Sequence, residues 1–104
     1  MKMTHTQNIE AIITQLMEEK QKLSSAYEEA EEQNNRAYER VLRWEEAYTA
    51  SNENEEVGQR LDKIYDEYNE ADKTMHEAEE KVEAIKEAID ALRKAVEAIK
   101  WLGL

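Results

Sequence analysis

Three residues of this 104-residue chain have the types and the spacing to bind a divalent cation: Asp72, His76 and Glu80. They recur every four residues, so on a helix their side chains would share one face. Nearly a quarter of all residues are acidic, however, and a His flanked by carboxylates is expected by chance at that density. The chain contains no Glu-x-x-His and no His-Glu-x-x-His motif. We therefore predict no metal site.

Catalytic chemistry has few other residues to use. The chain has no Cys, and its other His residue, His5, lies close to the start. Carboxylates are abundant, but a solvated helical surface provides no dry, concave pocket to hold a substrate or to shift their pKa values. With only two Gly there is no glycine-rich phosphate loop. We predict a protein that is not an enzyme and has no cofactor.

The composition indicates long helices. Two Gly and no Pro are too few for the turns of a β-sandwich, a barrel or repeated βαβ units. Apolar residues recur in alternating steps of three and four along two rows, a pattern typical of coiled-coil seams, which argues against disorder. The first row is Ile9, Ile13, Leu16, Lys20, Leu23, Tyr27, Ala30, Asn34, Ala37, Val41, Trp44 and Tyr48. The second row is Val57, Leu61, Ile64, Tyr68, Ala71, Met75, Ala78, Val82, Ile85, Ile89, Leu92, Val96 and Ile99.

The two rows predict one all-α domain over residues 1–104, a long antiparallel two-helix coiled-coil hairpin. Helix one should span about 6–50, the turn about 51–54 and helix two about 55–102. In an antiparallel pair, the residue numbers of two facing seam residues must add up to the same value along the whole seam. A sum of 105 meets this requirement, and it places Tyr48 opposite Val57 and Ile9 opposite Val96.

Side chains near the helix ends can act as caps. Asn52 or Asn54 can accept hydrogen bonds from the first amides of helix two, and Thr4 or Thr6 from those of helix one. Gly103 should end helix two.

Polar residues also occur within and beside the seam. Asn34 has two interpretations: a buried amide that disfavours shifted registers, or a partly solvated amide opposite Ala71. The stem of Lys20 should lie along the seam with its ammonium in water. Arg40 and Glu67 occupy facing g positions and can pair.

A second apolar stripe at the end of the hairpin that holds both termini predicts self-association. Two helices bury only a narrow seam, which is marginal for so short a chain, and small residues allow close helix approach. We predict a homodimer that forms a four-helix bundle, although alanines also simply favour helix. The predicted interface consists of Ile12, Met17, Ala84, Ala88, Ala91, Ala95, Ala98 and Leu102.

Charge is distributed unevenly along the chain, whose formal net charge is −11. Residues 28–80 carry 18 acidic and 6 basic side chains, whereas the remainder carry 7 and 8. Direct binding to nucleic acid or to an anionic membrane is not expected, because both need clustered cations. The acidic part has two interpretations, a solvated face or a surface for a basic protein. The residues predicted for that partner surface are Glu31, Tyr38, Tyr65 and Asp72.

These patterns leave three functional hypotheses. The first is a non-enzymatic helical-hairpin module for protein–protein interaction. The second is a small acidic inhibitor, such as a phage-encoded mimic of nucleic acid, that occupies a basic site.

We predict a cytoplasmic protein, because the sequence shows no apolar leader and no membrane span.

The third hypothesis rests on size and architecture, which resemble the small WXG100 proteins of type VII secretion and their helical helpers. The sequence departs from the Trp-x-Gly motif of that family: Trp44-Glu45-Glu46 lacks the Gly and lies within the predicted helix, and Val57-Gly58 lacks the Trp. Residues 68–72 match a Tyr-x-x-x-Asp export pattern, in mid-helix rather than in a C-terminal tail. The resemblance implies a secretion partner or helper, exported without a cleaved signal.

Overall fold

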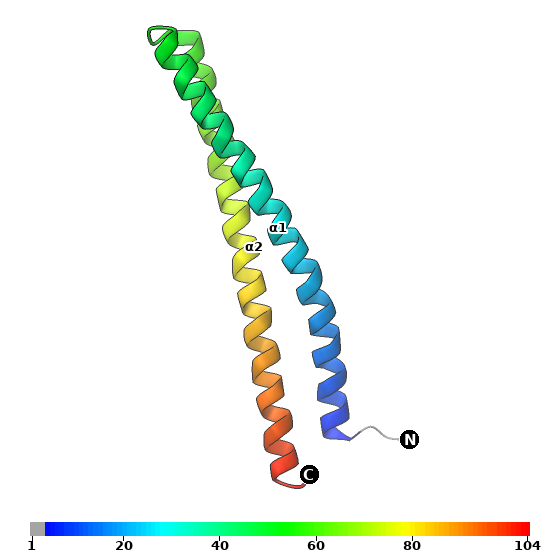
Figure 1. Ribbon diagram of the computed structural model, residues 1–104. Helices are drawn as coiled ribbons and strands as arrows, with labels where there is room; N and C mark the ends of the chain where they lie inside the picture. The colour runs from blue at the N-terminus through cyan, green and yellow to red at the C-terminus, as the bar shows by residue number, and fades with distance from the viewer. Residues whose placement is uncertain (1–3) are drawn as a thin grey trace. The chain divides into compact units, whose positions relative to one another are not determined.

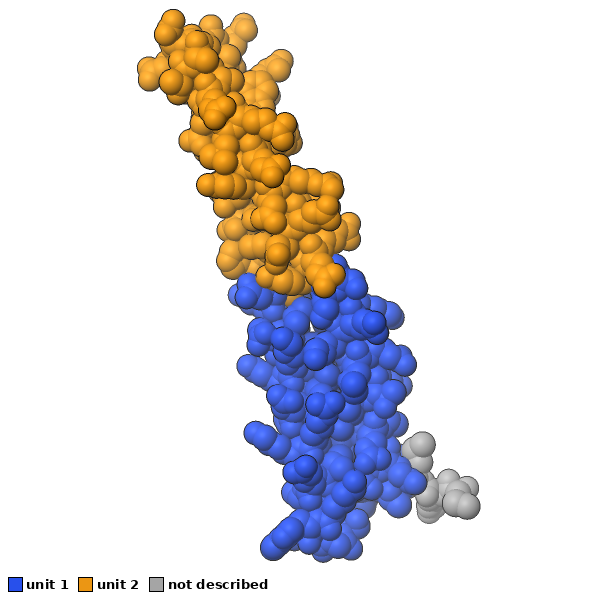
Figure 2. Space-filling model, in the orientation of Figure 1, with its two compact units in different colours: residues 1–25, 79–104 blue, residues 26–78 orange. Residues whose placement is uncertain are grey.

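The computed structural model describes residues 4–104 and contains two long α-helices, α1 (His5–Ala50) and α2 (Glu55–Trp101), joined by a short turn (Figure 1). The described residues include no β-strand. The prediction of an all-α chain with two long helices is confirmed. The chain divides into two compact units, and each unit contains a segment of both helices (Figure 2). Unit 1 comprises residues up to 25 and from 79 onward, and unit 2 comprises residues 26–78.

Side-chain caps begin both helices. The Thr4 hydroxyl accepts from the Gln7 amide at 3.2 Å while the Gln7 side chain accepts from the Thr4 amide at 2.9 Å, so the two form a capping box at the start of α1. Asn54 Oδ1 accepts from the amides of Glu56 and Val57 at 2.9 and 3.3 Å. Of the two candidates for the cap of α2, Asn54 is therefore the one that acts.

Both helices end in the same way. The amide of Glu53 donates to the carbonyl of Tyr48 and that of Asn52 to Thr49, the two bonds of a Schellman motif. Leu104 and Gly103 make the equivalent bonds at the end of α2. The second residue after the helix adopts a positive φ in each motif, 55° at Asn52 and 75° at Gly103. Asn52 thus occupies the position that glycine occupies at the other end.

The predicted seam is the buried part of both units. All twelve residues of the first row and all thirteen of the second are buried or half-buried. In unit 1, Ile13, Ile89 and Val96 form a cluster against which Ile9, Leu16, Ile85 and Leu92 pack. No described side chain is fully buried, so the core is a narrow stripe.

Cross-helix contacts show antiparallel pairing within each unit. In unit 1, Lys100 lies 3.6 Å from Glu10, and Arg93 contacts Met17. In unit 2, the guanidinium of Arg40 pairs with Glu67 at 2.7 Å, as the facing g positions predict. The hairpin prediction therefore fits.

Candidate interaction surfaces

The seam divides the surface of each unit into two faces. In heptad notation the seam holds positions a and d, positions e and b lie on one side of it, and g and c on the other. The contacts follow this division: Tyr65 bonds to Glu45 and Arg93 contacts Met17, in both cases e to e. The ion pair described above joins g to g. We call the two sides the e/b face and the c/g face.

The c/g face of unit 1 holds seven of the eight residues predicted for self-association. Ile12 and Leu102 are 46% and 61% exposed, and the alanines are exposed except for half-buried Ala95. Only Glu19, Lys22 and Lys81 carry formal charges on this face, so it is nearly neutral. The other members are Ala84, Ala88, Ala91 and Ala98.

Met17 lies elsewhere. It is an e residue, its sulfur is 3.7 Å from Arg93 Nη2, and both side chains line a groove on the opposite face from the alanines. The structure therefore does not bring Met17 together with Ile12. The heptad position already contained this information, because e and g residues flank a seam on opposite sides.

The four residues predicted to contact a partner in the acidic part all lie on the e/b face of unit 2. Glu31 and Tyr38 come from α1, and Tyr65 and Asp72 come from α2, each at an e position. Tyr38 is 51% exposed, and its ring packs 6.0 Å from that of Tyr68 in a tilted arrangement. Leu42, one turn after Tyr38, is 44% exposed and enlarges the apolar part of this face.

Charge is segregated between the two faces of unit 2. Its e and b positions hold six carboxylates and no Lys or Arg, whereas its c and g positions hold five acidic and five basic residues. Unit 2 carries 16 acidic and 6 basic side chains in all, and its remaining cation, Lys73, lies at an outer f position. The e/b carboxylates are Glu28, Glu31, Glu45, Glu55, Asp62 and Asp72.

Tyr65 is anchored to this acidic face. Its hydroxyl donates a 2.9 Å hydrogen bond to Glu45 Oε2. That bond, followed by desolvation and by the negative charges of Glu45 and Asp62, raises the pKa of Tyr65. The protonated phenol is thus the form that the surrounding carboxylates favour.

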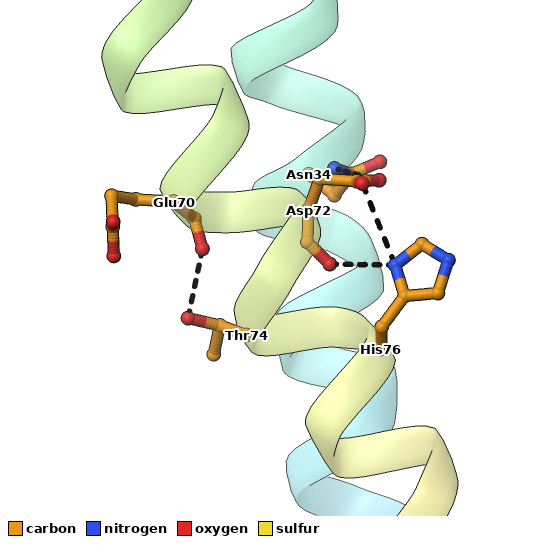
Figure 3. Close-up of polar contacts among 5 residues, drawn as sticks. All are labelled: Asn34, Glu70, Asp72, Thr74 and His76. Atoms are coloured by element: carbon orange, nitrogen blue, oxygen red, sulfur yellow. Dashed lines mark hydrogen bonds and ion pairs between the residues drawn. The ribbon is translucent and has the colours of Figure 1, made fainter.

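Asn34 and Asp72 connect the seam to the same face (Figure 3). Asn34 is 8% exposed, and its amide nitrogen lies 3.4 Å from Asp72 Oδ1, so the interpretation as a buried amide applies. His76 Nδ1 lies 2.8 Å from the Asp72 carbonyl oxygen and 3.5 Å from its carboxylate. A carbonyl oxygen can only accept, so the Nδ1 position carries the proton.

The sequence-derived metal triad is not assembled as a site. Asp72 and His76 are adjacent, but within residues 4–104 no three His, Asp or Glu side chains are grouped so that they could hold a metal ion. The contact of Asp72 with Asn34 gives this carboxylate a structural role across the seam.

An open groove lies on the e/b face beside the turn. Tyr48, Gly58 and Tyr65 line it together with the carboxylates of Glu45 and Asp62. A Cβ atom on Gly58 would lie 3.1 Å from the Tyr48 ring, which shows how closely the ring approaches the backbone. Sequence reasoning did not find this groove, and the one available signal was the Gly at an e position, where a side chain would otherwise lie.

Comparison with family models, with curated proteins and with solved structures finds no match to this chain. Within residues 4–104, neither of the two helices is long and apolar enough to cross a bilayer.

Proposed function

We propose that the chain is a non-catalytic protein–protein interaction module that associates with a second copy through the c/g face of unit 1. The observation that carries the proposal is the exposure of Ile12 and Leu102 along a continuous row of alanines. Covering this row would complete the narrow core of unit 1, and alanines let helix backbones approach closely. The expected product is a four-helix bundle.

The low net charge of the c/g face of unit 1 supports a second copy of the chain as its binding partner. A two-fold interface brings each surface against itself, so a face with strong net charge would repel its own copy. The c/g face of unit 1 has one acidic and two basic residues, which permits such pairing. Unit 2, with ten more acidic than basic side chains, would oppose it.

The experiment replaces Ala91 and Ala95 with Glu. Light scattering coupled to gel filtration should give twice the chain mass for the wild type and the mass of one chain for the double variant. Thr14→Glu with Gln21→Glu adds two charges to exposed positions on the opposite face and should remain a dimer. A wild type that is monomeric at all concentrations, or a double variant with unchanged mass, would refute the interface.

The other two hypotheses stay predictions. For the secretion hypothesis, Trp44 lies within α1 and Gly58 within α2, so the connecting turn contains neither residue of the family motif. Export that depends on a type VII secretion ATPase would support it. For the inhibitor hypothesis, loss of a captured partner at high salt would be expected.

A further inference from the structure

The e/b face of unit 2 combines exposed apolar side chains with one sign of charge. Tyr38 and Leu42 are its large exposed hydrophobic residues, one helical turn apart on α1. Tyr65 is half-buried on the facing row of α2. Exposed apolar residues with a charged surround are typical of surfaces that contact another protein.

The charge around these side chains indicates the chemistry of the partner. Six carboxylates occupy the e and b positions without a Lys or Arg among them, although unit 2 has six Lys and Arg side chains elsewhere. On the other surfaces of unit 2, three acidic residues pair with arginines: Glu32 with Arg36, Glu39 with Arg43 and Glu67 with Arg40. An arriving Lys or Arg would therefore find acceptors on the e/b face without displacing a Lys or Arg of this chain.

We propose that the e/b face of unit 2 binds a basic amphipathic α-helix of another protein. The apolar side of that helix would cover Tyr38 and Leu42, and its Lys or Arg residues would reach the carboxylates on either side. One cation would enter the groove beside the turn, where Glu45 and Asp62 approach the rings of Tyr48 and Tyr65.

A second copy of this chain does not supply such a helix. Unit 2 is itself strongly acidic, and unit 1 has nine acidic and eight basic side chains, with both signs on each of its helical segments. The partner is therefore a different protein. The proposal does not depend on self-association, which involves unit 1.

A labelled synthetic peptide tests the proposal with the full-length chain. The peptide, about 18 residues or five helical turns long, carries Leu on one side and Lys on the other. A control peptide has Gln in place of every Lys. Fluorescence anisotropy near physiological salt should show saturable binding of the Lys peptide and at least tenfold weaker binding of the Gln peptide.

Matched variants separate a specific face from general attraction to an acidic protein. Glu28→Gln, Glu31→Gln and Asp62→Asn together remove three exposed charges from the e/b face. Glu29→Gln, Glu46→Gln and Asp66→Asn remove three exposed charges from c and f positions of the same unit. The first triple variant should bind the Lys peptide at least tenfold more weakly, and the second within threefold of the wild type. Equal loss in both, or no binding by the wild type, would overturn the proposal.

The apolar contact has its own test. Leu42→Ser removes an exposed side chain from the e/b face, and Leu102→Ser does the same on the c/g face of unit 1. We expect the first to weaken binding at least fivefold and the second to leave it unchanged. Circular dichroism of each variant confirms that the helices are retained, and equal affinities of the two variants would refute the apolar contact.

Discussion

Units 1 and 2 share the same spacing of seam residues but differ in the character of their surfaces. In unit 1 the c/g face is apolar and nearly neutral, and the seam cluster consists of Ile, Leu and Val. In unit 2 the e/b face carries six carboxylates and no Lys or Arg, and buried Asn34 interrupts the seam. Seam residues thus determine how two helices pair, whereas flanking residues determine which other surfaces they can contact. Unit 1 is suited to a like surface and unit 2 to a basic one.

The largest effect should come from the aliphatic seam of unit 1. Ile89 is its most buried side chain, and Ile89→Ala should lower the free energy of unfolding by about 3 kcal/mol, through lost burial and the cavity that remains. Urea unfolding at fixed protein concentration measures the change. Glu87→Ala, at an exposed position of the same helix, should change it by less than about 0.5 kcal/mol. Similar losses would mean that the seam of unit 1 contributes little.

Asn34 is the buried polar residue in the seam of unit 2, and replacing it tests what this amide contributes. Asn34→Leu should raise the free energy of unfolding by about 1 kcal/mol, because apolar burial outweighs the long hydrogen bond to Asp72. Asn34→Asp should lower it, since it places a second carboxylate beside Asp72. Thermal unfolding ranks the three proteins. A less stable Leu variant would show that the amide makes a needed bond.

The cap of α2 lies at the turn of unit 2 and should contribute to its stability. Asn54→Ala removes the acceptor of two amide hydrogen bonds and should cost about 1 kcal/mol. Asn69→Ala, at an exposed position within the same helix, should cause no loss, since alanine favours helix. Chemical denaturation of both variants measures the difference. Equal stabilities would contradict the role of Asn54.

The smallest effect concerns the phenol on the acidic face. The pKa of Tyr65 is raised above its ordinary value of 10.0. The contribution of the protonated phenol to the stability of the fold is therefore complete below pH 10.0 and is lost as the pH rises through the raised pKa. Glu45→Gln should lower this pKa, because the negative charge that accepts the hydrogen bond is removed. Absorbance of tyrosinate, compared with that of Tyr65→Phe, measures it. An unchanged pKa would show that Glu45 does not hold the phenol.

The helices, the seam and one cross-helix ion pair could be predicted because they follow from periodicity. The rotamer of a side chain does not follow from periodicity. Asn34 was expected opposite Ala71, yet its amide reaches Asp72, the neighbouring residue that offers an acceptor. The choice between Asn52 and Asn54 was also open, since Asn suits both a helix cap and a positive φ. Counting charge along the chain revealed the acidic part. Its separation into faces appears only when the charges are assigned around each helix.

The turn also has a kinetic consequence. Contacts in unit 2 join residues close in sequence, 20 apart for Tyr65 with Glu45 and 38 for Asn34 with Asp72, whereas Arg93 and Met17 in unit 1 are 76 apart. Closing a loop of 76 residues directly costs about 1 kcal/mol more conformational free energy than closing one of 20 residues. Contacts between residues close in sequence also form faster. Folding should therefore begin at the turn and proceed toward the two ends of the chain. Unit 2 should form before unit 1, and self-association through unit 1 should follow only when both of its helical segments have folded.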